Sequence, residues 1–181
     1  MVETRKLATA SLFAVIIAIA KGPILPPPTG DLLVAVEALL LGLGFVLIGF
    51  GGATFIGAIA GLLINLIEPG FWAFPFLLAA LYGLQVDVFS SLFRARRGAD
   101  VSTSRMVASL TLSSATTGPI AYYATVSAGL VPSSPVGFYL FLVAYGIVSG
   151  AIGAYLAVKL WNRNMKGWFI RMNPSATSAS G

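Results

Sequence analysis

The chain has 181 residues, of which 57% are hydrophobic and 9% are charged, with a formal net charge of +5 and neither Cys nor His. Soluble domains carry about 25% charged residues, so this composition and a mean hydropathy of +0.91 indicate a protein surrounded by lipid. The absence of Cys and His excludes disulfides, thiolate zinc sites, haem ligation and catalysis by either residue. No GxxxxGK[ST] or GxGxxG motif occurs, so the chain carries no phosphate-binding loop of its own.

Apolar runs separated by Gly and Pro predict an all-α integral membrane bundle of six transmembrane helices. Asp31 is placed to cap the second helix, a glycine turn at 49–52 joins the second to the third, and Glu68-Pro69-Gly70 ends the third. We expect a single domain over 1–165 and a cytoplasmic tail over 166–181, disordered at its end. The predicted helices cover residues 7–21, 31–49, 52–67, 71–93, 105–129 and 136–161.

The basic residues predict the orientation of these helices. With six crossings, every Lys and Arg except Lys21 falls on the same side of the membrane, which the positive-inside rule assigns to the cytoplasm. We therefore expect a multi-pass protein of the cell membrane with both termini inside. An alternative is that residues 1–20 form a cleavable signal peptide ending at Ala18-Ile19-Ala20, which would leave five helices.

Small residues four apart form ridges on three predicted helices, where helix packing in lipid requires them. On the third helix (Ala53, Gly57, Gly61) and the sixth (Gly146, Gly150, Ala154 and Ser149, Gly153, Ala157) they predict packing inside the bundle. On the first helix, Ala10, Ala14 and Ala18 form a flat face that could instead bind a partner subunit within the membrane.

A short six-helix chain with AxxxA in its first helix resembles the substrate-binding S components of energy-coupling factor (ECF) vitamin transporters. The segments GGATFIGAIAGLLINLIEPG and GIVSGAIGAYLAVKL are most similar to the group for thiamine or its hydroxymethylpyrimidine precursor. That group has an acidic residue before the end of the fourth helix, which Asp87 matches, and tends to have one in the third helix, where this chain has Asn65. Because this chain has Asn65 in place of that acidic residue, the identity of the substrate stays open.

The resemblance implies a mechanism. S components bind a vitamin near the extracellular side and deliver it through a transmembrane T subunit and two cytoplasmic ATPases. In that family the AxxxA face meets the T subunit, so Ala10 and Ala14, with Ala18 as an extension, are the expected partner-binding residues. The resemblance implies no cofactor, no enzymatic activity and no nucleic-acid partner.

Polar groups inside a membrane are costly, about 2.5–3.5 kcal/mol each for charged ones, so each is a functional candidate. Acidic and aromatic groups near the outer helix ends would suit a flat, cationic or hydrogen-bonding ligand beneath the proline-rich loop 22–30. Lys21, the one outer basic residue, is expected to extend toward the interface. The substrate-binding candidates are Glu37, Asn65, Glu68, Trp72, Thr117, Tyr122, Tyr145 and Asp87.

Each candidate has a plainer interpretation. Trp72 and Tyr122 could be aromatic residues of the membrane interface, and Glu68 could simply face water. Nothing basic lies within one helical turn of Glu37. Asp87 lies about 24 Å from the outer end of its helix, which suits a structural role, including a pair with Arg94, as well as a functional one.

Three alternative functions remain open. The same scaffold could bind riboflavin, biotin or a cobalamin precursor. A membrane-embedded enzyme could use Glu37 or Asp87, although no metal-ligand cluster accompanies them. A self-contained channel or carrier is the third alternative, and it would be expected to show repeated halves, which the sequence lacks.

Overall fold

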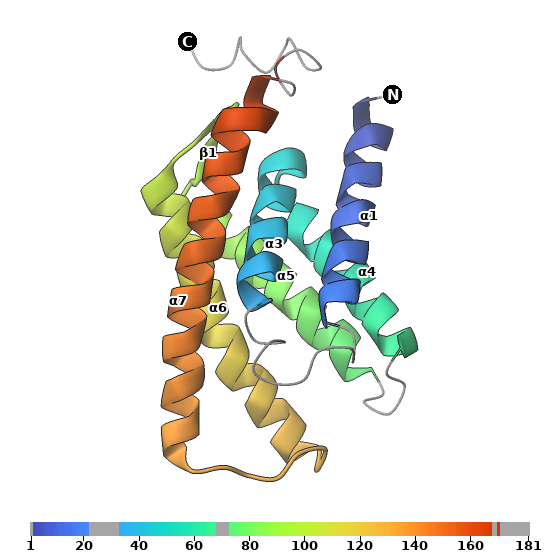
Figure 1. Ribbon diagram of the computed structural model, residues 1–181, viewed down its shortest axis with the longest axis vertical. Helices are drawn as coiled ribbons and strands as arrows, with labels where there is room; N and C mark the ends of the chain where they lie inside the picture. The colour runs from blue at the N-terminus through green and yellow to red at the C-terminus, as the bar shows by residue number, and fades with distance from the viewer. Residues whose placement is uncertain (1, 22–32, 68–72, 168–169, 171–181) are drawn as a thin grey trace.

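A computed structural model describes residues 2–21, 33–67, 73–167 and 170 of the chain. In this part of the chain the fold is all-α, with six α-helices that alternate in direction along the bundle (Figure 1). The helices are α1 (Val2–Lys21), α3 (Val34–Ile48), α4 (Gly52–Ile67), α5 (Phe74–Leu92), α6 (Thr103–Ser127) and α7 (Val136–Leu160), and α7 continues into a π-helical turn, η2 (Trp161–Met165).

The predicted helices agree with these bounds to within a few residues, and α4 matches its prediction at both ends. The largest difference is at α1, which begins at Val2 rather than at residue 7. The first residues of α1 are polar, so an apolar window finds only the later part of the helix. Asp31, Glu68, Trp72 and the loop 22–30 lie outside the described residues.

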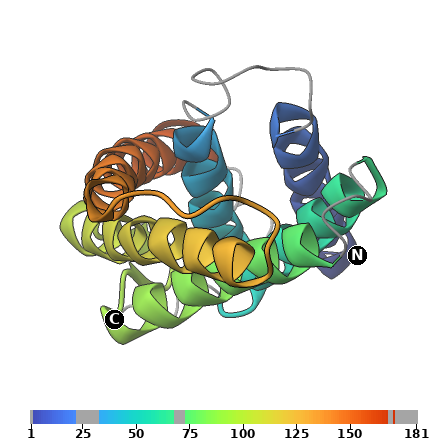
Figure 2. The same cartoon turned by 90° about the horizontal axis from the view of Figure 1, so that it is seen from below.

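The helices form two closely packed antiparallel pairs, α4 with α5 and α6 with α7. Helix α3 packs against both α7 and α4, and α1 packs against α4 and α3 (Figure 2). Because the number of helices is even, α1 begins and α7 ends at the same end of the bundle (Figure 1). The loop between α5 and α6 lies at this end, and Lys21 lies at the other.

Glycines set the spacing within each pair. A Cβ added at Gly57 of α4 would lie 2.3 Å from the backbone oxygen of Ala79 on α5, and one added at Gly146 of α7 would lie 2.4 Å from that of Ser114 on α6. Only a residue without a Cβ allows these backbones to approach so closely. The ridges predicted on the third and sixth helices are buried, so the prediction of internal packing is confirmed.

The ridge on the first helix is also buried. Ala10 and Ala14 are 0% exposed and Ala18 is 3% exposed, because this side of α1 faces α3 and α4. The prediction that the three alanines form an accessible partner-binding face is therefore wrong for this conformation. The flat alanine side of α1 lets neighbouring helices of the same chain approach it closely, so it contributes to packing within the chain.

The loop between α5 and α6 contains a small hairpin that the sequence did not predict. Strands β1 (Arg96–Arg97) and β2 (Asp100–Val101) pair antiparallel across Gly98, whose φ is +58°. The indole Nε1 of Trp161 donates a hydrogen bond to Ala99 O at 3.1 Å, and Lys166 Nζ lies 2.5 Å from Asp100 Oδ1. These contacts fasten the basic loop to the end of α7.

The outside of the bundle is strongly apolar. Two helical stretches of the described chain, Phe74–Leu92 and Val136–Met165, are long and apolar enough to cross a membrane. Helices α3 and α4 are apolar but shorter. Large apolar side chains project outward, among them Leu66 (79% exposed) on α4 and Leu140 (68% exposed) on α7. Large apolar side chains are thus exposed on most of the described helices.

The close contact at Gly57 generates a prediction. Gly57→Ala places a methyl group against the backbone of α5, so the variant should lose about 1–3 kcal/mol of stability. Thermal unfolding of the detergent-purified protein measures this loss. Gly137→Ala is the matched control, because a Cβ there meets nothing within 4 Å, and it should unfold no earlier than the wild type. Equal melting temperatures for the two variants would contradict the packing described for α4 and α5.

Candidate functional site

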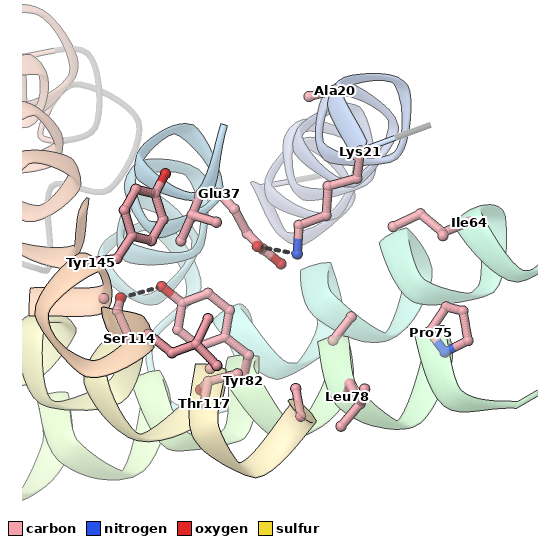
Figure 3. A pocket seen from close by; sticks show the side chains of 16 residues that line it. Ala20, Lys21, Glu37, Ile64, Pro75, Leu78, Tyr82, Ser114, Thr117 and Tyr145 are labelled. Carbon is pink, nitrogen blue, oxygen red and sulfur yellow. Dashed lines mark hydrogen bonds and ion pairs between the residues drawn. The ribbon is translucent and has the colours of Figure 1, made fainter. Parts of the chain in front are cut away.

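A cavity of about 470 Å³ lies between the end of α1, the first turn of α3 and the facing parts of α4, α5, α6 and α7 (Figure 3). This volume is in the range of small-molecule sites. One part of its wall is apolar and includes Ile64, Leu78 and Leu142. The polar side chains of the wall are Lys21, Glu37, Tyr82, Ser114, Thr117 and Tyr145.

An ion pair crosses one side of the cavity. Lys21, the last residue of α1, extends its ammonium group to the Oε2 oxygen of Glu37 in the first turn of α3 (Figure 3). The Glu37 side chain is 3% exposed and that of Lys21 is 33% exposed. Lys21 therefore points into the bundle rather than toward the interface as expected. The sequence alone did not reveal this ion pair, because its two residues lie on different helices.

A second polar pair lies deeper among the helices. Tyr82 of α5 is 3% exposed, and its hydroxyl lies 2.6 Å from Ser114 Oγ of α6. Both residues line the cavity, and neither was predicted. A tyrosine buried in an apolar helix normally has a partner for its hydroxyl, so the Tyr in LLAALYGL was the available signal.

Two of the other predicted residues line the cavity. The hydroxyls of Thr116 and Thr117 on α6 donate to Gln85 Oε1 of α5, at 2.9 and 2.8 Å, and Thr117 also faces the cavity. Tyr145 of α7 also lines the cavity, and its ring stacks on Phe141 with a centroid distance of 6.0 Å. With Glu37, the structure thus brings three of the predicted side chains to one cavity.

Tyr122 and Asn65 lie outside the cavity wall. The Tyr122 hydroxyl donates to Pro132 O at 3.1 Å, and its ring packs edge-on against Phe138 and Tyr139, so it fastens the connection between α6 and α7. Asn65 follows Ile64, which does line the cavity, and its Oδ1 is buried with no hydrogen-bond partner among the described residues. Glu68 and Trp72 lie outside the described residues.

Asp87 holds the start of a neighbouring helix. Its carboxylate accepts hydrogen bonds from the backbone N–H groups of Ala53 (3.2 Å) and Thr54 (2.8 Å) and from the Thr54 hydroxyl (2.6 Å). The first N–H groups of a helix have no partner within it and favour negative charge, so a carboxylate stabilises them. The cavity wall does not include Asp87, and the suggested pair with Arg94 is replaced by these contacts.

Comparison with protein-family models, with curated proteins and with solved structures finds no match for this chain. Within the described residues, no group of three or more His, Cys, Asp and Glu side chains is placed to hold a metal ion. The chemistry available at the cavity is therefore that of one ion pair, several hydroxyl groups and an apolar wall.

The contacts of Asp87 generate a prediction. Asp87→Ala leaves two backbone N–H groups buried without an acceptor, so the protein should lose about 2–4 kcal/mol of stability. Asp100→Ala is the control, because its carboxylate is exposed and its ion pair is with the partly exposed Lys166, and it should cost less than about 1 kcal/mol. Denaturant or thermal unfolding compares the two variants. Normal stability of Asp87→Ala would refute the capping role.

Proposed function

We propose that the chain is a six-span protein of the cell membrane that binds a small, vitamin-sized molecule in the cavity between its helices. The observation that carries this proposal is the position of the cavity, which is lined by a buried carboxylate and hydroxyl groups inside an otherwise apolar bundle. Polar groups inside apolar helices are costly to place there, so their convergence on one cavity favours a role in binding.

The distribution of apolar side chains supports a lipid environment. Leucine, isoleucine and phenylalanine project from the outer sides of the helices, whereas serines such as Ser109, Ser113 and Ser149 are buried between them. In water, so many large apolar side chains on the surface of a monomer are unusual. Helices α3 and α4 have 15 and 16 residues, which span about 22–24 Å, and a bilayer can thin locally around such short segments.

The distribution of charge supports cytoplasmic termini. Among the described residues, the basic side chains of α1's first turns, of the α5–α6 loop and of the end of α7 lie at one end of the bundle, and the cavity lies toward the other. By the positive-inside rule the basic end faces the cytoplasm. The cavity would then receive its ligand from outside the cell.

The cavity wall favours a particular class of ligand. Glu37 offers a carboxylate, which Lys21 neutralises in this structure, and the rest of the wall is apolar except for four hydroxyl groups. These hydroxyl groups belong to Tyr82, Ser114, Thr117 and Tyr145. A small ring with a positive charge or several N–H donors would satisfy both parts of the wall. Thiamine or its hydroxymethylpyrimidine precursor is our first candidate, in keeping with the resemblance to ECF S components.

Delivery of the ligand would require partners. The chain has no nucleotide-binding motif, so energy for uptake would come from a T subunit and two ATPases, as in the transporters that it resembles. The partner would dock on another surface than the Ala10, Ala14 and Ala18 ridge, since α3 and α4 already cover that ridge.

Ligand binding can be tested with purified protein. Isothermal titration with thiamine, hydroxymethylpyrimidine, riboflavin and biotin should show tight binding of one of the first two. Glu37→Gln should weaken that binding at least about tenfold, because it removes a charge-assisted hydrogen bond. Asp100→Asn, an acidic residue at the opposite end of the bundle, should bind normally. Failure of every vitamin to bind, or full binding by Glu37→Gln, would contradict the proposal.

Transport by the chain alone provides a separate test. Proteoliposomes that contain only this chain should bind the vitamin without accumulating it, because nothing in the chain couples uptake to ATP. Filtration assays with labelled thiamine, in the presence and absence of an ion gradient, measure this. Accumulation driven by the gradient would identify a self-contained carrier and exclude a subunit that depends on ATPases.

A further inference from the structure

The two members of the ion pair at the cavity are held very differently. Glu37 is 3% exposed and belongs to α3, which packs against α7, α4 and α1. Lys21 is 33% exposed and is the final residue of α1. Its four-carbon side chain can adopt many orientations, whereas the short side chain of Glu37 is confined by the helices around it.

This difference determines which of the two groups can move away from the ion pair. Moving Lys21 away from Glu37 returns a partly exposed ammonium group to a more polar environment, which a long lysine side chain reaches readily. The carboxylate of Glu37 has no comparable route, because its helix would have to move with it. An unpaired buried carboxylate is strongly unfavourable, so Glu37 needs a cation at all times.

We propose that Lys21 is a displaceable counter-ion, which neutralises Glu37 while the cavity is empty and yields its place to a cationic group of the ligand. The inference rests on the proposed function and specifies how the same site selects its substrate. Among the described residues of the cavity wall, Lys21 is the one basic side chain and Glu37 the one acidic side chain. The exchange therefore conserves the charge of the cavity.

The opposite role, with Lys21 as an anchor for an anionic ligand, fits the geometry poorly. An anion bound to Lys21 would lie beside the buried carboxylate of Glu37, and like charges at such a distance repel strongly where water is excluded. A neutral ligand could enter but would gain nothing from displacing Lys21. The site thus discriminates by charge, and Tyr82, Ser114 and Thr117 remain available as hydrogen-bonding groups.

Chemical rescue tests the exchange without knowledge of the natural ligand. Lys21→Ala removes the counter-ion and should lower the melting temperature. Butylammonium, which has the length and charge of a complete lysine side chain, should raise it again by several degrees at millimolar concentration. Sodium butyrate should not, because an anion cannot pair with Glu37. If Lys21→Ala fails to fold, Lys21→Gln, whose uncharged side chain is about one atom shorter than that of lysine, permits the same comparison.

Three controls make the outcome decisive. The wild type and Lys159→Ala, which lacks a lysine at the far end of α7, should show no stabilisation by butylammonium. Neither should the double variant Lys21→Ala/Glu37→Gln. Rescue confined to the single variant at residue 21 supports the inference. Absence of rescue, rescue by butyrate, or equal rescue of the double variant overturns it.

A binding measurement provides a second test of the exchange at Glu37. Because the ligand no longer competes with Lys21, Lys21→Ala should bind thiamine about tenfold more tightly than the wild type. Weaker binding would overturn the exchange and assign Lys21 to ligand contact. If butylammonium rescues the variant but no vitamin binds to either protein, the proposed function fails while the exchange at Glu37 stands.

Discussion

Close contact between helix backbones is the constraint on which the rest of this molecule depends. Small residues at the helix contacts let the backbones touch. Gly57 and Gly83 bring α4 and α5 together, and Gly146 and Gly150 do the same for α6 and α7. The cavity lies toward the end of the bundle where α1 ends at Lys21 and where Glu37 lies in the first turn of α3.

The described chain has two fully buried carboxylates, and the structure satisfies them in different ways. Asp87 accepts hydrogen bonds from the start of α4, and these bonds connect α5 to its antiparallel neighbour α4. Glu37 is neutralised by a lysine from another helix that remains partly exposed. A carboxylate with fixed partners stabilises a fold, whereas one with a movable partner can exchange it, which is why we assign binding to Glu37.

The alanine ridge of α1 shows that one sequence feature can suit either of two structural roles. An AxxxA pattern predicts a flat helix face, and that face is equally suited to a partner subunit and to a neighbouring helix of the same chain. Ala10 and Ala14 are covered by α3 and α4, so in this structure the face packs against helices of the same chain. If the proposed function holds, a docking surface for energising subunits would lie among the apolar side chains that the helices present outward.

Local patterns in the sequence determined the helices and their approximate bounds, because apolar runs and Gly and Pro breaks act within one segment at a time. They also predicted that Glu37, Thr117 and Tyr145 are functional candidates, since polar groups in apolar helices are costly wherever they occur. Only the tertiary structure decided which polar groups meet. The pairs Lys21–Glu37 and Tyr82–Ser114 and the cap of α4 by Asp87 join different helices. No spacing along the chain encodes such contacts, because they depend on how each helix is rotated against its neighbours.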